Sequence, residues 1–359
     1  MLALLISDLA AGRHLSGDQV RSAVDQLIDP DIAAEIKADF LCHLALKGET
    51  HGEIAAFAAA LREKSIRPPL DPQTRARPIL DVVGTGGDRM NTFNISTTVA
   101  IVCAAAGIPV AKHGNRAITS QVGSADVLEA LGIRIDLPPT EAAQSLRDLG
   151  FAFFFAPNYH PAFKYIGAAR RLCADRGQRT IFNFLGPLLN PARPDCLLVG
   201  VPRPDLCEPL ARVLQALGVR RAMVVSGEVQ PTSAARVSGS PDPKTHLDEL
   251  STLGDSAIAE FYQERGLACS HLARETFSLQ PATLEDLRGA DRDTNARIIR
   301  KLLAGEERGP KRDAVLLNAA AAMLVADAAK SLLDGWRLAA EVIDSGQAAK
   351  KLNTLAARS

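Results

Sequence analysis

In the stretch LDVVGTGGDRMNTFNIST, residues 80–97, glycines and hydroxyls surround the carboxylate of Asp88. The apolar run before Gly84 is typical of a strand, and a helix is expected to begin near Ser96. A strand that turns through glycines into a helix leaves backbone N–H groups bare at the positive end of that helix. This arrangement suits a phosphate, although a tight turn alone also needs glycine. Asp88 would repel a phosphate, so its presence indicates a ligand that also carries hydroxyls or a cation.

A second group of polar residues, KHGNR at 112–116, follows the next expected strand. The carboxyl ends of neighbouring parallel strands meet at one edge of the sheet, where open α/β sheets bind ligands. We therefore expect the two groups to face the same ligand. Ser124 comes shortly afterwards and is expected to cap the helix that follows it, a role that does not exclude binding the ligand as well.

Two further groups have a purely structural alternative. The adjacent carboxylates of Asp248 and Glu249 would be a solvated helix N-terminus on a plain surface. Beside a polyphosphate they would instead be Mg²⁺ ligands, because hard cations bind carboxylate and phosphate oxygens. In NYHPAFKYIGAARRL, residues 158–172, His160 and Lys164 are expected on one helical face, with Arg170 further along. Such a basic helix usually faces solvent, but an Arg170 turned into the cleft would suit the carboxylate of a second substrate.

The pattern along the chain predicts two parts. Residues 1–66 carry helical patterns only, and four prolines in RPPLDPQTRARP, 67–78, mark a boundary. Beyond it, short apolar runs alternate with helical stretches, which predicts an α/β part with a mainly parallel central sheet. In the Ala-rich C-terminal helices, Asn318 and Trp336 are expected to be packing residues. The expected strands are 79–83, 108–112, 151–156, 196–201 and 221–226.

Charge and composition exclude several classes of protein. The 41 Lys and Arg residues balance 41 Asp and Glu residues, so no overall positive field attracts nucleic acid or an anionic membrane. The six cysteines are scattered without a C-x-x-C pair, which is typical of reduced, buried thiols. No basic leader precedes the first apolar stretch, and no run of about 18 apolar residues occurs, so a cytoplasmic location is expected.

Taken together, the motifs resemble those of the anthranilate phosphoribosyltransferases. The resemblance implies transfer of the 5-phosphoribosyl group from phosphoribosyl pyrophosphate (PRPP) to the amino group of anthranilate, with Mg²⁺ and loss of pyrophosphate. It also implies a small all-helical domain, 1–70, completed by a helix near 162–177, a larger α/β domain, 78–359, and a homodimer formed through the helical domain. The motifs follow the family's order: GTGGD (84–88), T-x-N-x-S-T (92–97), KHGNR (112–116), GSADVLEALG (123–132), H-x-x-x-K with a following Arg (160–170), RTIFNFLGPLLNPA (179–192) and LDEL (247–250).

The resemblance also assigns roles to single residues. Asp88, Lys112 and Arg170 are expected to be catalytic through positioning and charge stabilisation, without a covalent nucleophile. Ser96 is expected to touch one Mg²⁺, and Asp248 with Glu249 to hold a second. The residues expected at anthranilate are Gly84, His113, Asn115, His160 and Arg170. Those expected at PRPP are Gly84, Thr85, Gly86, Gly87, Asp88, Thr92, Asn94, Ile95, Ser96, Thr97, Lys112, Ser120 and Ser124.

The chain departs from the family pattern near the acidic pair. Ser226-Gly227 stands where His-Gly is common, His246 replaces a glycine, and the loop 228–245 is longer than expected. These differences bear on the geometry of the metal site at Asp248 and Glu249. Two other functions compete with the transferase: a pyrimidine-nucleoside phosphorylase, which would need neither KHGNR nor the acidic pair, and a non-catalytic relative that binds nucleic acid, which the zero net charge disfavours.

Overall fold

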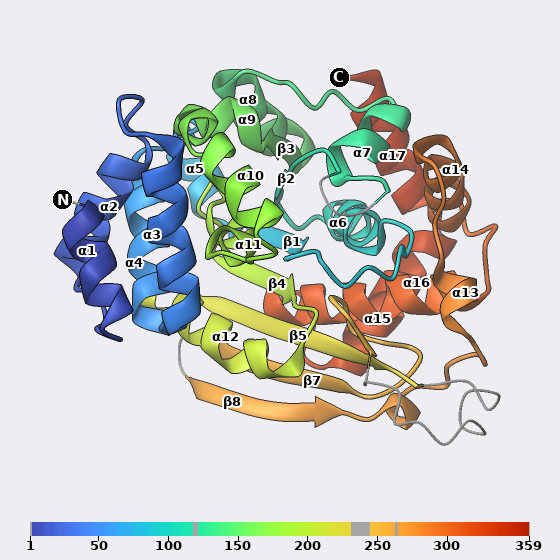
Figure 1. Ribbon diagram of the computed structural model, residues 1–359. Helices are drawn as coiled ribbons and strands as arrows, with labels where there is room; N and C mark the ends of the chain where they lie inside the picture. Colours follow the sequence, from blue (N-terminus) through green and yellow to red (C-terminus); the bar gives the residue numbers. More distant parts are fainter. Residues whose placement is uncertain (1, 118–120, 231–244, 263–264, 359) are drawn as a thin grey trace.

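The computed structural model describes residues 2–117, 121–230, 245–262 and 265–358 (Figure 1). Its N-terminal part is a group of helices, and two of them begin with the reciprocal side-chain caps that favour helix initiation. Ser16 and Gln19 start one of these helices, and Thr50 and Glu53 start the other. The helices are α1 (Leu2–Ala10), α2 (Gly17–Leu27), α3 (Ala34–Lys47) and α4 (His51–Glu63), followed by the short α5 (Pro72–Arg75).

An eight-stranded sheet forms the centre of the rest of the chain, in the order β3-β2-β1-β4-β5-β7-β8 with β6 beside β5. The first five strands pair in parallel, as predicted, and only β5 extends more than two residues beyond its expected end. Their carboxyl ends therefore lie at one edge of the sheet. These strands are β1 (Leu80–Gly84), β2 (Val110–Gly114), β3 (Phe151–Phe155), β4 (Cys196–Gly200) and β5 (Arg221–Val229).

An antiparallel extension, which the sequence analysis did not predict, completes the sheet. It consists of β6 (Thr245–Leu247), β7 (Ser256–Tyr262) and β8 (Arg265–Leu272). The small residues of β7 have weak strand propensity, so its sequence gives little signal. Gly227 of β5 pairs with β6 on one side and with β7 on the other. Strands β4 and β6 therefore lie on the same side of β5. The residues after Leu247 consequently lie at the carboxyl end of β4.

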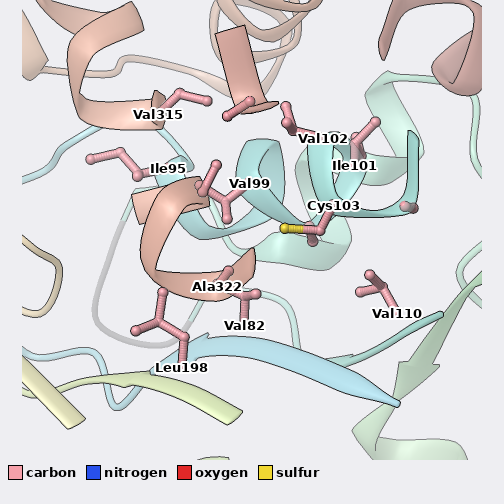
Figure 2. Close-up of a cluster of buried hydrophobic side chains, with 14 of the residues drawn as sticks. Val82, Ile95, Val99, Ile101, Val102, Cys103, Val110, Leu198, Val315 and Ala322 are labelled. Atoms are coloured by element: carbon pink, nitrogen blue, oxygen red, sulfur yellow. The ribbon is translucent and has the colours of Figure 1, made fainter. Parts of the chain in front are cut away.

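Helices cover both faces of the sheet, and side chains of successive strand residues enter different cores. Leu198 of β4 packs with Val99 of α6 and Ala322 of α15 (Figure 2), whereas Leu197 packs in the core shared by α12 and the N-terminal helices. The remaining helices are α6 (Ile95–Ala105), α7 (Ser124–Ala130), α8 (Pro139–Leu149), α9 (Ala156–Tyr159), α10 (Gly167–Asp175), α11 (Phe182–Leu185), α12 (Cys207–Ala216), α13 (Leu284–Leu287), α14 (Arg292–Leu303), α15 (Pro310–Val325), α16 (Leu332–Asp344) and α17 (Gln347–Ala357).

The helix expected near 162–177 is shorter than expected. Helix α9 ends before Pro161, which opens a 3₁₀ turn at Pro161–Tyr165, and α10 begins only at Gly167. Proline has no N–H to donate, so Pro161 separates α9 from the 3₁₀ turn. Helix α10 packs on α3 of the N-terminal group, where the sulfur atoms of Cys42 and Cys173 lie 3.6 Å apart.

Candidate active site

The glycine-rich turn leaves the carboxyl end of β1 and reaches α6. Gly86 and Gly87 have φ angles of +72° and +86°, a region that side chains other than glycine rarely adopt. Gly84 needs to be glycine for another reason, because a Cβ there would collide with the carboxylate of Asp248. The bare backbone therefore serves both the turn and the close approach of an acidic side chain.

The acidic segment that follows β6 lies directly over the ends of two parallel strands. A Cβ on Gly200 of β4 would collide with the backbone of Asp248, and a Cβ on Gly227 of β5 would lie 2.6 Å from the carbonyl oxygen of Glu249. Glycine at both positions lets this segment approach the sheet backbone closely. The two carboxylates are thus held at the carboxyl ends of β1, β4 and β5.

Three carboxylates gather around the turn. Oδ2 of Asp248 accepts the N–H of Gly86 at 2.8 Å, and the Asp248 N–H points at Oδ2 of Asp88 at 3.5 Å. Burial, reinforced by the charge of Asp88, raises the pKa of Asp248 to about 8. Burial and the charge of Asp248 likewise raise the pKa of Glu249 well above its usual value. A site that crowds carboxylates in this way favours a bound cation.

Lys112 supplies a buried positive charge beside these carboxylates. It is 1% exposed, and its Nζ donates to the carbonyl of Val82 at 2.7 Å and lies 3.5 Å from Oγ of Ser96. Burial lowers the pKa of Lys112, while the charges of Asp81 and Glu249 oppose that shift. The N–H of Ser96, in the first turn of α6, stabilises the Glu249 carboxylate. Lysine, hydroxyl and carboxylate therefore meet at the N-terminus of α6.

A second cluster begins at the residue after Lys112. The rings of His113 and His160 are 5.3 Å apart, His160 stacks on Phe163 at 5.2 Å, and Phe163 meets the edge of Phe182 at 5.7 Å. The guanidinium of Arg170 lies 5.3 Å from the centre of the Phe182 ring. We call His113, His160, Phe163, Phe182 and Arg170 the aromatic cluster.

Burial keeps the histidines of the aromatic cluster neutral at pH 7. It lowers the pKa of His113 to about 3, assisted by His160, and that of His160 to about 4. In the part of the chain that the structure describes, Nε2 of His113 and both ring nitrogens of His160 make no hydrogen bond of ordinary geometry. Burial also lowers the pKa of Arg170. The aromatic cluster thus combines apolar ring faces, buried ring nitrogens and one cation.

Comparison with known proteins covers nearly the whole chain. Residues 76–349 match the model of the glycosyl transferase family, a/b domain, and residues 4–65 match its helical bundle domain. The anthranilate phosphoribosyltransferase of Moorella thermoacetica is 45% identical over 358 residues, which span 99% of this chain and 98% of that protein. The enzyme of Chloroflexus aggregans is 42% identical, over 98% of this chain and 96% of its own. The chain belongs to the anthranilate phosphoribosyltransferase family.

Solved structures of family members share the fold. The enzyme of Thermus thermophilus superposes with a TM-score of 0.85 at 38% identity, covering 99% of this chain and 98% of that one. The enzyme of Saccharomyces cerevisiae in complex with PRPP and Mg gives 0.83 at 26% identity, covering 99% and 97%. The predicted fold class, a helical domain with a larger α/β domain, is confirmed.

Several residues expected at PRPP face other partners in this structure. The side chain of Asn94 donates to the carbonyl of Val122 and accepts from Asn295, each at 3.1 Å. Ile95 lies in the hydrophobic core, so only its backbone faces the turn. Thr92 forms an isolated bridge with Arg288.

Other residues of the expected PRPP set stay near the turn. The N–H of Thr85 donates to the carbonyl of Gly200 at 2.9 Å, which ties the turn to β4. Thr97 is buried, and its hydroxyl has no partner among the described residues. Ser120 lies outside the described residues.

The expected cap at Ser124 is wrong, because the cap of α7 is Gly123. The N–H of Gly123 donates to Asp126 at 3.0 Å, and Ser124 is the first helical residue. The Ser124 hydroxyl instead donates to the carbonyl of Asn115 at 3.5 Å. Asn115 accepts the N–H of Arg116 through its side chain at 2.8 Å.

Lys164 does not share a helical face with His160, since the 3₁₀ turn separates them. It is exposed, with its ammonium 4.7 Å from the ring centre of Tyr165, whereas His160 is buried. Near the acidic pair, Ser226 is fully buried in β5 and His246 pairs with Glu228 in β6. Both ends of the segment expected as a loop, 228–245, are therefore strand.

Sequence reasoning missed several residues near the site. Phe163 and Phe182 lie inside quoted motifs, but a single aromatic residue in a helical pattern gives no sign that it lines a site. Asn190 is fully buried and donates to Asp81 at 2.8 Å and to the carbonyl of Ala111 at 2.7 Å, which joins β1 to β2 under the site. Its place in the N-P pair of the family motif was the only signal.

The donor set fits Mg²⁺ better than a metal held by protein alone. Among the residues that the structure describes, no three His, Cys, Asp or Glu side chains are arranged to hold a metal ion. Magnesium is usually bound through one or two carboxylates together with substrate phosphates and water. The raised pKa values of Asp248 and Glu249 fit such a partner, because a cation relieves the repulsion between them.

A search of the described helices for a membrane-spanning segment found none of sufficient length and hydropathy.

Proposed function

We infer that the chain transfers the 5-phosphoribosyl group of PRPP to the amino group of anthranilate and releases pyrophosphate. One observation carries this inference: consecutive residues of β2 face two chemically different sites. Lys112 faces the glycine-rich turn, and His113 belongs to the aromatic cluster. A bisubstrate reaction needs such adjacency of two chemically different sites.

On the PRPP side, the chain offers cations, bare N–H groups and hydroxyls. The N–H groups of the turn and the N-terminus of α6 would bind phosphate oxygens, and the ammonium of Lys112 would balance the charge that grows on the leaving pyrophosphate. Asp88 would accept hydrogen bonds from ribose hydroxyls. Thr97, whose buried hydroxyl has no described partner, would donate to the same ligand.

On the anthranilate side, the aromatic cluster would hold a flat, anionic ring. The faces of Phe163 and His160 suit an aromatic ring, and Arg170 suits its carboxylate. Neutral histidines add polar contacts without a competing charge. Because an aromatic amine is neutral at pH 7, its lone pair is available and no strong general base is needed. The protein's task is to aim the nitrogen at C1 of the ribose while the C1–O bond to pyrophosphate breaks.

The hydroxyl of Ser96 would touch one Mg²⁺, and Asp248 with Glu249 would hold a second, together with the pyrophosphate oxygens. The ions would supply charge neutralisation for the leaving group when they are bound. Asp248 and Glu249 follow the end of β6, and Ser96 lies in α6, so the three side chains come together only in the folded protein. The S. cerevisiae relative in complex with PRPP and Mg supports this choice of ion.

We further propose that the chain forms a homodimer through its helical part. Leu4 of α1 and Leu46 of α3 are 72% and 73% exposed, and Ile36 of α3 and Tyr165 beside it are also exposed. Helices α1 and α3 pack on each other, so these side chains come from neighbouring elements. Exposed apolar groups gathered in one region favour a partner surface.

The decisive experiment follows the loss of anthranilate fluorescence after PRPP is added to the purified protein, with and without Mg²⁺. Turnover that requires both PRPP and Mg²⁺ is expected. Phosphorolysis of a pyrimidine nucleoside in the same preparation, without anthranilate turnover, would replace this proposal with the phosphorylase. Salt-sensitive binding of DNA without either activity would favour the non-catalytic relative.

A further inference from the structure

Asn318 lies in α15, yet its side chain is bonded to the acidic segment. It is fully buried. Its Oδ1 accepts the N–H of Leu250 at 2.9 Å, and its Nδ2 donates to the carbonyl of Leu250 at 3.0 Å and to that of Ala314 at 2.9 Å. Both backbone polar groups of Leu250, the residue after Glu249, are therefore held by one side chain. This is more than the packing role expected from the sequence.

The amide of Asn318 takes the place of a neighbouring strand. Strand β6 ends at Leu247, so the ladder of backbone hydrogen bonds stops before Leu250. Leu250 is itself buried, and a buried N–H or C=O without a partner is costly. Asn318 satisfies both groups and so makes an irregular, buried turn stable at this position.

Asn318 also fixes the orientation of the peptide groups beside Leu250, which packing alone does not fix. The glycines at 200 and 227 determine how closely the acidic segment approaches the sheet. Hydrogen bonds are directional, so the bonds from Asn318 set the planes of the peptide groups on both sides of Leu250. The first of these peptides joins Leu250 to Glu249, and its orientation sets the direction in which the Glu249 side chain leaves the backbone.

Two helices that pack on each other, α6 and α15, thus both contribute groups near Glu249. Helix α15 contacts α6, and Figure 2 shows Val315 and Ala322 of α15 beside Val99 of α6. The Ser96 N–H of α6 lowers the pKa of Glu249 against the larger effect of burial, while α15 provides Asn318 to the backbone after Glu249. The core between these helices is tightly packed, so the two supports keep a constant separation.

We propose that Asn318 is a positioning residue of the Mg²⁺·PRPP site, which orients Glu249 and Asp248 through the backbone of Leu250. The proposal rests on the proposed function, because that function assigns the metal to the acidic pair. Partners that orient metal ligands typically contribute 10- to 100-fold in metal affinity or activity. We expect a loss of this order when the amide of Asn318 is removed.

The test compares Asn318→Leu and Asn318→Ala with Met323→Ala, a control in which another buried side chain of α15 is shortened. Binding of Mg²⁺·PRPP is measured by calorimetry without anthranilate, so that no turnover occurs. Both Asn318 variants are expected to bind about 10-fold more weakly or worse. In turnover assays they should need more Mg²⁺, reach near-normal kcat at saturating Mg²⁺ and keep the wild-type KM for anthranilate. Met323→Ala should lower the melting temperature and leave Mg²⁺·PRPP binding unchanged.

The proposal is overturned if the Asn318 variants bind Mg²⁺·PRPP as wild type does, or if Met323→Ala weakens binding equally. If Asn318→Leu does not fold, Asn318→Ala decides. Amide hydrogen exchange on the wild-type protein gives a test independent of any variant, because the Leu250 N–H should be strongly protected and rapid exchange would refute the bond. A wild-type protein without Mg²⁺-dependent turnover contradicts the proposed function instead, so the two failures are distinct.

Discussion

The carboxylate of Asp248 accepts a hydrogen bond from the backbone N–H of Gly86 at 2.8 Å, across 162 positions of sequence. An acidic side chain thus occupies part of the turn that suits a phosphate. Its raised pKa records the cost of this position, since burial and the neighbouring Asp88 both disfavour its charge. The site is therefore under electrostatic strain until a cation and an anion enter it together.

This strain predicts how stability depends on pH. In the unfolded chain the carboxyl of Asp248 would ionise near pH 4, whereas in the folded protein its pKa is about 8. Between these values the folded state binds the extra proton, so this group makes the free energy of unfolding fall as pH rises. Asp248→Asn keeps an acceptor for the Gly86 N–H and removes the charge. The variant is expected to melt at a higher temperature than wild type at pH 8 and to show a smaller difference at pH 5, by calorimetry without ligand.

The control for this prediction is Asp136→Asn, which removes an exposed carboxylate whose side chain is 72% exposed. It should leave the difference between the two pH values unchanged. A lower melting temperature of Asp248→Asn at pH 8 would contradict the prediction.

Lys112→Met should lower kcat by about 10²- to 10³-fold, the scale of losing a charge that stabilises a leaving group. Methionine matches the length of the buried stem without its charge, so the variant is expected to fold. Turnover is measured by fluorescence, and folding by circular dichroism. Arg212→Ala serves as the control, because Arg212 is exposed on α12 and pairs with Glu208. A Lys112→Met enzyme with ordinary kcat would remove this residue from the chemistry.

Arg170→Ala should raise the KM for anthranilate about 10- to 100-fold and leave the KM for PRPP nearly unchanged, because a charge-assisted hydrogen bond to a carboxylate is lost. Lys164→Ala is a matched control, since it removes a neighbouring cation that is exposed. Steady-state kinetics with each substrate varied in turn provides the measurement. If both substitutions raised the KM for anthranilate equally, Arg170 would act only through its positive charge and not through a specific contact with the carboxylate.

Leu4→Glu combined with Leu46→Glu should convert the proposed homodimer to a monomer, because two charges would be buried at the proposed contact. Sedimentation velocity across a range of concentrations measures the state. Leu333→Glu is the control, as Leu333 is a 48% exposed residue of α16, outside the helical part. A wild-type protein that sediments as a monomer would contradict the proposed dimer.

The parts of the fold that sequence predicts well are those encoded locally. Apolar runs such as 196–201 predict strands because a buried parallel strand is apolar on both faces. The β7 strand escaped prediction because its alanines and serine have weak strand propensity and gain strand structure from pairing with β5 on one side and β8 on the other. The expected helix at 162–177 is shorter for a local reason, since a 3₁₀ turn at Pro161–Tyr165 precedes α10, which begins at Gly167.

The residues of the candidate site also differ in how well the sequence predicts them. Motif residues such as Lys112 and Asp248 were found because their chemistry stands out from the surrounding apolar strands. Asn318 was expected only to be a packing residue. No local sequence pattern connects it with its hydrogen-bond partner Leu250, which lies 68 positions away. Residues that act through the backbone of another segment leave no mark in sequence spacing, and only the folded structure joins them.

The pairing of β5 with β6 has a consequence for protein engineering. Val229 and Thr245 are opposite one another in the ladder, so the two ends of the stretch between them are held together. Closing a longer stretch between fixed ends costs little, as the entropy grows only with the logarithm of length. Peptide tags or reporter sequences inserted after Gln230 should therefore be tolerated.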